Sequence, residues 1–500
     1  MGCVWRWTGT STIWAKQVVG AGTARPQAAK LVCAALFSAW LSLIFSPHAM
    51  AGRLPAPVKA AMKHAGLPPS SVGIWVQDVT RTAPALAHGA ERPMSPASTM
   101  KLLTTYAGLE LLGPAYTWKT EVYANRPLAG GVLDGDLLIK GYGDPTLNLE
   151  KFWLLLRELR SRGVREIRGD LVLDKSYFAV AHQEPGTFDN EPLRAYNVEP
   201  DALLVNFNVV RLRLAPQAGK LQVAADPLPA RLAIVNAVQL DSSACGDWRS
   251  GITTVTRETP DGITLDLGGR YSADCGEKPL NLSLLKNGHY VFGLFQQLWT
   301  ELGGSIVGNV RAGPIPTDAR LLASATSPAL AEVIRDINKF SNNVMARQLY
   351  LTIGAERAGP PGSTANAAQA LQGWLGAKGM HFPELVVDNG SGLSRTERIS
   401  PRHLGMLLRA AFDSPVFGEL ESSLPIVAVD GTMKKRLGEQ TVAGHAHIKT
   451  GSLEGVKAIA GYVFDRKGRR MAVVCLINHP NAAAGQAVQD ALLQWVYARP

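Results

Sequence analysis

The chain of 500 residues has no acidic side chain before Asp78. Four basic residues precede an apolar run from Leu31 to Phe45, namely Arg6, Lys16, Arg25 and Lys30. A basic region, an apolar core and the small-residue site Ala49-Met-Ala51 are together typical of a secretory signal peptide. We therefore expect residues 1–51 to be a signal peptide that is cleaved after about Ala51, and the mature protein to be exported, with a periplasmic location.

Long apolar runs are also scarce. The run from Leu31 to Phe45 could instead be a membrane anchor, but it is shorter than the roughly 20 apolar residues that a spanning helix needs. It also ends at Ser46-Pro47, just before the cleavage-like site. Because no later segment is long and apolar enough to span a bilayer, we expect no stable membrane span after signal cleavage.

Cysteine is rare, with five residues in the whole chain, of which Cys3 and Cys33 lie in the leader. Cys245 and Cys275 lie in polar, turn-rich sequence, where a disulfide is stable in an oxidising compartment, so we predict that they pair. Cys475 lies in an apolar strand pattern, which favours a buried free thiol over a catalytic one.

Metal-binding and nucleic-acid-binding signatures are missing. The ten histidines show no metal-ligand spacing, so we predict neither a metal site nor a cofactor. The formal charge of +10 falls to +6 once the four basic leader residues are removed. No basic run or nucleic-acid-binding module accompanies this modest excess, so we expect no nucleic-acid partner.

The chain does contain a serine followed three residues later by a lysine at a predicted helix start, Ser98-Thr-Met-Lys101. Ser95 is a candidate N-cap and Pro96 the first helical residue, which places Ser98 in the first turn. The free N–H of Ser98 can then stabilise an oxyanion while its hydroxyl attacks. Lys101 shares the helix face and can act as base if its pKa is lowered, for which a second lysine, Lys449, is the candidate.

Two further short motifs follow in order, Ser341-Asn-Asn343 and Lys449-Thr-Gly451. A second serine–lysine match, Ser283-Leu-Leu-Lys286, lacks the cap, the proline and the spaced partners, so we treat it as chance. The three motifs resemble the S-x-x-K, S-x-N and K-T-G signature of penicillin-binding proteins and serine β-lactamases.

The first two motifs are 243 residues apart, which implies a large insertion in the catalytic domain. This arrangement resembles the D-alanyl-D-alanine carboxypeptidase/endopeptidases of the penicillin-binding protein 4 type, the peptidase S13 family. The likeness runs over essentially the whole mature chain. Four further stretches agree with it: Gly143–Leu147, Asp388–Arg395, Asp430–Thr432 and Lys449–Leu453.

The resemblance implies an α/β (α+β) fold with a β-lactamase/transpeptidase-like domain. We assign residues 52–117 and 317–500 to this penicillin-binding catalytic domain, and 118–316 to an inserted, mainly β region of two subdomains. The sequence pattern predicts strands over Val72–Val79, Ala458–Phe464 and Arg470–Ile477 and helical segments over Leu149–Gly163, His289–Gly303 and Ala329–Ile353.

The family also implies roles for the second and third motifs. Ser341 would relay a proton between the attacking serine and the leaving amine, and Asn343 would bind the substrate amide and Lys101. Taken alone, this stretch also reads as an ordinary turn between helices.

The third motif is expected on a strand at the edge of a sheet. There Lys449 and Thr450 would bind the carboxylate of a terminal D-alanine. Gly451 would leave room for the substrate along the strand edge, and the N–H of Ser452 would complete the oxyanion hole.

Family members also use an acidic residue five positions before an aromatic one to contact the peptide side chain. Glu191 and Tyr196 have this spacing. Glutamate stands where the family pattern has aspartate, and Asp189 is close enough to compete for the role. Ordinary loop chemistry is an equal alternative for this pair.

The sequence therefore predicts a serine DD-peptidase that cleaves D-Ala-D-Ala termini or cross-links of peptidoglycan peptides through a Ser98 acyl-enzyme, with β-lactams as covalent inhibitors. One alternative is a serine β-lactamase, which would need a positioned deacylation base between the second and third motifs, and no convincing one is found. The other is a non-catalytic wall-binding scaffold, which would not need Ser98, Lys101, Ser341, Asn343 and Lys449 together.

Overall fold

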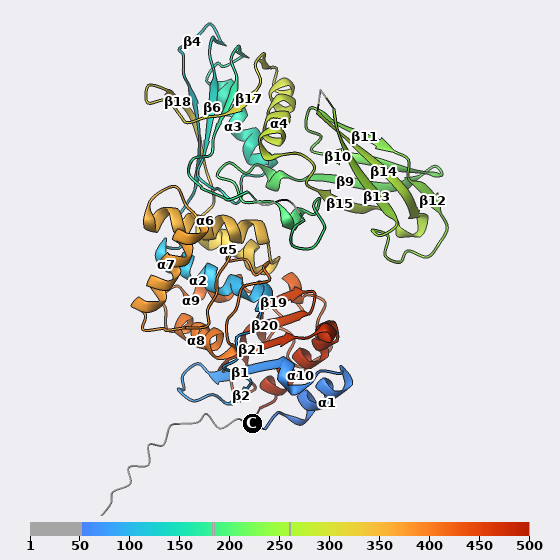
Figure 1. Cartoon of the computed structure of the whole chain (residues 1–500), viewed down its shortest axis with the longest axis vertical. Coiled ribbons are helices and arrows are strands. Elements are labelled where there is room, and N and C mark those ends of the chain that lie inside the picture. The colour runs from blue at the N-terminus through green and yellow to red at the C-terminus, as the bar shows by residue number, and fades with distance from the viewer. Residues whose placement is uncertain (1–52, 183, 185, 260–261, 500) are drawn as a thin grey trace, which may run out of the picture. The chain divides into compact units, whose positions relative to one another are not determined.

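A computed structural model describes residues 53–182, 184, 186–259 and 262–499 (Figure 1). The predicted signal peptide, residues 1–51, lies outside the described residues. Among the helices that are described, none is long and apolar enough to cross a membrane.

A five-stranded antiparallel sheet joins the two ends of the described chain, in the strand order β19-β20-β21-β1-β2. Its strands are β1 (Val72–Asp78), β2 (Leu86–His88), β19 (Ala446–Leu453), β20 (Val456–Phe464) and β21 (Arg470–Asn478). The blue strand β1 lies beside the red strand β21 in Figure 1, paired over its whole length. The three predicted strands are thus confirmed.

Both faces of this sheet are buried, because apolar residues occupy both sides of the strands. All seven residues of β1 are buried. Ile74 faces the cluster that contains α1 (Ala56–His64) and α10 (Gln486–Tyr497), and its neighbour Trp75 faces the cluster that contains α8 (Pro401–Phe412). This alternation follows from the two-residue period of a strand.

Further helices cover the face of the sheet on which Trp75 lies, and they carry the first two motifs. They are α2 (Lys101–Leu111), α5 (Leu330–Lys339), α6 (Asn343–Ala358), α7 (Thr364–Ala377) and α9 (Phe417–Ser423). Helix α2 is buried over most of its length. Gly108 lets it approach α6 closely, since an added Cβ would lie only 3.1 Å from a methyl group of Leu349.

The helical segment predicted over Ala329–Ile353 is interrupted. Helix α5 ends at Lys339 and α6 begins at Asn343, so the second motif occupies the turn between them. Ser341 has a positive φ of 57°, which a continuous helix does not allow. The Asn342 side chain accepts from the N–H of Met345 and caps α6.

The chain between α2 and α5 leaves and returns through paired strands, β3 (Lys119–Ala124) and β18 (Arg320–Thr326). These belong to a sheet of order β17-β8-β6-β3-β18. Its other strands are β6 (Leu137–Gly141), β8 (Leu171–Asp174) and β17 (Val310–Ala312). A small sheet adds β4 (Leu128–Ala129), β5 (Val132–Leu133), β7 (Glu166–Ile167) and β16 (Ser305–Ile306). Helices α3 (Leu149–Ser161) and α4 (Asn287–Glu301) confirm the two predicted helical segments.

Two more sheets contain the remaining strands of this region. One has the order β10-β9-β15, and the other has β11 and β12 beside β14, which also pairs with β13. The strands are β9 (Val210–Gln217), β10 (Lys220–Asp226), β11 (Leu232–Asn236), β12 (Gln239–Asp241), β13 (Ile252–Thr259), β14 (Gly262–Ser272) and β15 (Lys278–Leu282).

The cysteines are arranged as predicted. Cys245 and Cys275 form a disulfide with an S–S distance of 2.00 Å. Cys475 is a free, fully buried thiol in β21, and burial raises its pKa to about 12. A thiol with so high a pKa is largely protonated near neutral pH and therefore a poor nucleophile.

Candidate active site

The nucleophile candidate Ser98 lies in a single 3-10 turn, Ala97–Met100, that leads directly into α2. The predicted N-cap at Ser95 is wrong, because the turn begins after Pro96 and no side chain caps it. Ala97 instead has a positive φ of 44°. Such strained backbone persists only when its surroundings hold it in place.

Two glycines from distant motifs hold this turn. A Cβ on Gly392 would lie 1.9 Å from the carbonyl oxygen of Ala97, and one on Gly451 would lie 2.9 Å from the backbone nitrogen of Ser98. Gly451 is therefore required first by the nucleophile turn of the protein itself, rather than only by a substrate along the strand edge.

Lys101 links the first motif to the second. Its Nζ donates to Ser98 Oγ over 2.9 Å, to Asn343 Oδ1 over 2.6 Å and to the carbonyl oxygen of Ser391 over 2.5 Å. The three acceptors come from the 3-10 turn, the start of α6 and the Asp388–Arg395 stretch. An amine so placed can exchange a proton with the Ser98 hydroxyl.

Lys101 is fully buried, and burial lowers its pKa well below the ordinary value. The nearby charge of Lys449 lowers it further, whereas the carboxylate of Glu397 opposes this change in pKa. A lysine amine that is neutral near physiological pH can serve as a general base. The predicted electrostatic influence of Lys449 on Lys101 is thus present.

Lys449 links the third motif to the second. Its Nζ donates to Ser341 Oγ and to the carbonyl oxygen of Thr450, each over 2.8 Å. Burial lowers its pKa to about 7. Both strand β19 and the turn at Ser341 are therefore fixed around this amine.

The Asp430–Thr432 stretch supports the third motif. The Thr450 hydroxyl donates to that of Thr432 over 2.8 Å. Lys339, at the end of α5, donates to Asp430 Oδ2 over 2.6 Å. Gly431 has a positive φ of 54°, and a Cβ there would lie 2.5 Å from the Lys339 carbonyl oxygen. The stretch thereby ties β19 to the helix before the second motif.

Glu397 is a buried residue that the sequence reasoning missed. Its Oε1 accepts from the backbone N–H groups of Asp388, Asn389 and Gly390 over 3.2, 3.0 and 2.9 Å. Its Oε2 has no hydrogen-bond partner, and burial raises the pKa of this carboxyl. Glu397 thus shapes the turn whose Ser391 carbonyl receives Lys101. Its place just beyond the Asp388–Arg395 stretch was the signal available in the sequence.

A cavity of about 310 Å³ opens beside this turn, which we call the rim cavity. Among its lining residues are Arg347 of α6 and Arg395, whose guanidinium lies 4.7 Å from the centre of the Phe188 ring. Arg347 Nε has no hydrogen-bond partner. Glu199 and Asp388 also line it, so the cavity combines cationic and acidic groups with apolar walls.

The structure does not bring Glu191 and Tyr196 together. The Tyr196 hydroxyl donates to Asp189 Oδ2 over 2.7 Å, and Glu191 accepts from Arg194 Nε over 3.0 Å. Both predicted residues are exposed, and neither lines the rim cavity. Of the two acidic residues Glu191 and Asp189, it is Asp189 that accepts the hydrogen bond from Tyr196.

Ser452 follows Gly451 on β19 and is exposed. No group of three or more histidine, cysteine, aspartate or glutamate side chains in the described part of the chain is arranged to hold a metal ion. The Ser98 hydroxyl is contacted by the Lys101 amine, which the Asn343 side-chain amide holds in turn.

A model of the D-Ala-D-Ala carboxypeptidase 3 (S13) family matches residues 54–499. The chain belongs to this family. The family predicted from the three motifs is thus confirmed, and the match extends across the long segment between the first and second motifs.

Curated S13-like relatives cover most of the chain. A D-alanyl-D-alanine carboxypeptidase of Actinomadura sp. (strain R39) is 29% identical over 452 residues, which are 87% of this chain and 82% of the relative. D-alanyl-D-alanine carboxypeptidase DacB of Haemophilus influenzae is 26% identical over 414 residues, which are 82% of this chain and 85% of the relative.

Solved structures show the same fold. Penicillin binding protein 4 (dacB) from Haemophilus influenzae superposes with a TM-score of 0.75 at 24% identity, covering 88% of this chain and 99% of that one. The same protein complexed with a β-lactam gives a TM-score of 0.72 at 23% identity, covering 89% and 100%. The predicted α+β fold, with a β-lactamase/transpeptidase-like domain, is confirmed.

Proposed function

We propose that this S13 family member is a serine DD-peptidase that acts on peptidoglycan peptides ending in, or cross-linked through, D-alanine. The observation that carries the proposal is the fully buried Lys101 amine, which donates to both Ser98 Oγ and Asn343 Oδ1. The D-alanyl-D-alanine carboxypeptidase relatives from Actinomadura and Haemophilus support the same activity.

The Lys101 amine must first lose one proton; its two remaining N–H groups can then stay on Asn343 Oδ1 and the Ser391 carbonyl, and its lone pair faces Ser98. In the acylation step this neutral amine takes the proton of the Ser98 hydroxyl as Oγ attacks the carbonyl carbon of the penultimate D-alanine. The bond between Oγ and that carbon forms, and the negative charge moves to the carbonyl oxygen. The N–H groups of Ser98 and Ser452 would bind this oxyanion. Asn343 would orient the substrate amide while its Oδ1 holds Lys101.

Collapse of the tetrahedral species breaks the peptide C–N bond, and the leaving nitrogen needs a proton. Ser341 would carry the proton from Lys101 to this nitrogen, because its hydroxyl oxygen already accepts from Lys449 and its own hydrogen can point to the substrate. Water then attacks the acyl-enzyme with Lys101 again as base. The products are the shortened peptide and free D-alanine, or an amine from a cross-link.

The third motif would bind the carboxylate of the terminal D-alanine through Lys449 and Thr450. Gly451 keeps β19 close to the nucleophile turn, which would hold these groups at the scissile bond. β-Lactams would acylate the same serine, as expected of a penicillin-binding enzyme. Glu191 and Tyr196 would contact the amino end of the peptide side chain, as the family resemblance implies; in the structure they contact Arg194 and Asp189.

Three finer predictions belong to the same proposal. Residues 52–117 and 317–500 would form the catalytic domain, and 118–316 the inserted region of two subdomains; the pairing of β3 with β18 supports this division. The protein would be exported to the periplasm. It would act without a cofactor and without a nucleic-acid partner.

The direct test is release of D-alanine from a short acylated peptide ending in D-Ala-D-Ala. We expect the mature protein to release D-alanine stoichiometrically with the shortened peptide, and Ser98→Ala to release none. Turnover of a β-lactam faster than of this peptide would favour the β-lactamase instead. Absence of both activities would leave the scaffold as the better account.

The pH dependence of peptide cleavage should report Lys449. With a pKa of about 7, the amine is protonated below neutral pH and loses its proton as the pH rises. Only the protonated form attracts the substrate carboxylate, so we expect kcat/KM to fall above pH 7, by up to about tenfold per pH unit. Lys449→Arg remains protonated, so this alkaline decline should disappear even if the rate is lower. The same decline in both proteins would contradict the assignment.

A further inference from the structure

A second cavity, of about 560 Å³, lies within the region between the first and second motifs. We call it the inner cavity. Its size falls within the roughly 300–1,000 Å³ typical of small-molecule sites. It shares the lining residues Val180, Glu199 and Pro200 with the rim cavity, so the two cavities are adjacent. A ligand that passes these residues from the Asp388–Arg395 turn would enter it.

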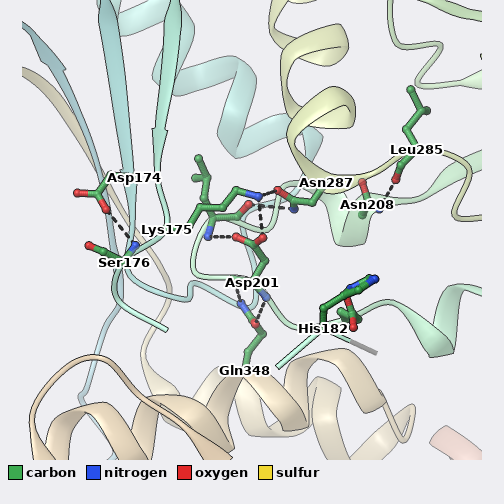
Figure 2. Close-up of polar contacts among 11 residues, drawn as sticks. Asp174, Lys175, Ser176, His182, Asp201, Asn208, Leu285, Asn287 and Gln348 are labelled. Atoms are coloured by element: carbon green, nitrogen blue, oxygen red, sulfur yellow. Dashed lines mark hydrogen bonds and ion pairs between the residues drawn. The ribbon is translucent and has the colours of Figure 1, made fainter. Parts of the chain in front are cut away.

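A partly buried polar network lies at the inner cavity (Figure 2). The Lys175 ammonium donates to Asp201 Oδ2 over 2.7 Å and also to Asn287. The Asp201 backbone is paired with Gln348, which accepts its N–H over 3.0 Å and donates to its carbonyl over 2.9 Å. Because Gln348 is fully buried on α6, one helix fixes both this network and Asn343.

Asn208 supplies an unused acceptor in the lining of the inner cavity. Its Nδ2 donates to the carbonyl of Leu285 over 2.8 Å and to Ser283 Oγ over 3.1 Å, but its Oδ1 has no hydrogen-bond partner. The residue is only 6% exposed and has a positive φ of 54°. A buried polar atom without a partner is rare in native proteins.

The rest of the lining is mixed in charge. Glu199, Asp201 and Glu258 are acidic, whereas Lys175, Lys286 and His182 are basic. Figure 2 shows His182 apart from the Lys175 network. Small apolar side chains complete the walls, among them Val180, Leu193, Leu204 and Ile263. This lining suits a short peptide with small side chains that has both amine and carboxylate groups.

We propose that the inner cavity binds the second stem peptide of a cross-linked peptidoglycan substrate, while the first lies at Ser98. This inference rests on the proposed DD-peptidase function and adds a binding site to it. Glu258 would receive an ammonium N–H of that second peptide, and Lys175 or Lys286 its carboxylate. Cross-linked peptides would then bind more tightly than single peptides.

Strand β13 offers a matched pair of variants. Thr256 and Glu258 are exposed residues that line the inner cavity, whereas the equally exposed Thr253 does not line it and points to the other face of the strand. Thr256→Trp would fill the cavity, and Thr253→Trp would add the same bulk outside it. Glu258→Gln would remove one carboxylate without adding bulk.

The test is calorimetric measurement of the affinity for a cross-linked peptide dimer that carries no sugars. All proteins are the full mature chain with Ser98→Ala, so that the ligand is not cleaved. We expect Thr256→Trp to weaken binding at least tenfold and Glu258→Gln several-fold, with Thr253→Trp unchanged. Thermal unfolding of each variant confirms that it is folded. If Thr256→Trp does not fold, the affinity of Glu258→Gln for the dimer is compared with that of Thr253→Trp instead.

Three results would overturn the inference. The first is no binding of the dimer to the Ser98→Ala protein, and the second is equal affinity of all the cavity variants for the dimer. The third is an equal loss of affinity for a single sugar-bearing peptide in the cavity variants, which would identify glycan as the occupant. Failure of the DD-peptidase proposal is seen separately. It appears as no D-alanine release by the wild-type protein from the short peptide, which does not reach the inner cavity.

Discussion

Replacing Lys101 with methionine lowers the rate of Ser98 acylation by a penicillin by roughly 10³-fold or more. The expected loss follows from the removal of the general base, an effect typically worth about 10²–10⁴ in rate. Lys101 is the one group in the described structure that donates to Ser98 Oγ, Asn343 and the Ser391 carbonyl together. The second-order acylation rate constant, measured by stopped-flow fluorescence or quenched mass spectrometry, gives the result.

The same variant is expected to unfold at a higher temperature than the wild type. Burial lowers the pKa of Lys101, so the folded state binds its proton less well than the unfolded state does. This destabilises the wild type at pH values below the unfolded lysine pKa of about 10.4, by about 1.4 kcal/mol for each tenfold loss of proton affinity. The penalty shrinks as the pH rises toward that value. Methionine carries no such penalty.

Acylation within about tenfold of the wild-type rate in Lys101→Met would contradict the assignment of the base. A loss of acylation accompanied by a lower unfolding temperature would instead indicate damaged packing. The two measurements together therefore separate a chemical role from a structural one.

Replacing Glu397 with alanine slows acylation by about 10- to 100-fold. Three backbone N–H groups lose their acceptor, and an unmade buried hydrogen bond costs about 1–3 kcal/mol. The turn that places the Ser391 carbonyl at Lys101 is thereby loosened. Glu397→Gln keeps one carbonyl oxygen as acceptor and is expected to recover much of the rate.

The pH profile distinguishes positioning from general destabilisation. The Glu397 carboxylate raises the pKa of Lys101, so its removal lowers that pKa further. Acylation needs the neutral amine and rises with pH through the Lys101 pKa. The acid limb of the acylation rate against pH should therefore move to lower pH in both Glu397 variants. An unmoved acid limb would show that Glu397 acts only on stability, and slowed deacylation alone would identify it as a deacylation base.

The catalytic motifs were readable from the sequence because their spacing is local. Ser98 and Lys101 are one helical turn apart, and the Lys449 motif lies on an alternating apolar strand pattern. The disulfide was readable from the turn-rich sequence around Cys245 and Cys275. Each motif spans only a few neighbouring residues, whereas the family was inferred from all three motifs and their order along the chain.

The contacts that shape the site could not be read in this way. Gly451 packs against the turn at Ala97, and Gly392 does so from another loop, so their necessity depends on tertiary contacts. The Ser95 cap failed because Ala97 adopts a strained backbone in place of a capped helix start. Glu397 belongs to no recognised motif, and its role is visible only in the backbone groups that it binds.

The contacts of Glu191 and Tyr196 could not be read from their spacing, for the same reason. The five-residue interval says nothing about which carboxylate the loop turns toward the phenol. Asp189 accepts the hydrogen bond from Tyr196, and Glu191 instead accepts one from Arg194. Short loops with several acidic residues allow more than one pairing, which sequence distance alone cannot rank.

Intact-mass measurement of the mature protein with benzylpenicillin, followed over minutes to hours and mapped by peptide mass, determines whether Ser98 is the acylated nucleophile. We expect one adduct of the added penicillin mass, located on Ser98, which persists and decays slowly. A rapidly vanishing adduct would contradict the DD-peptidase in favour of a β-lactamase. No adduct at all, or an adduct on another residue, would contradict the role of Ser98 as nucleophile.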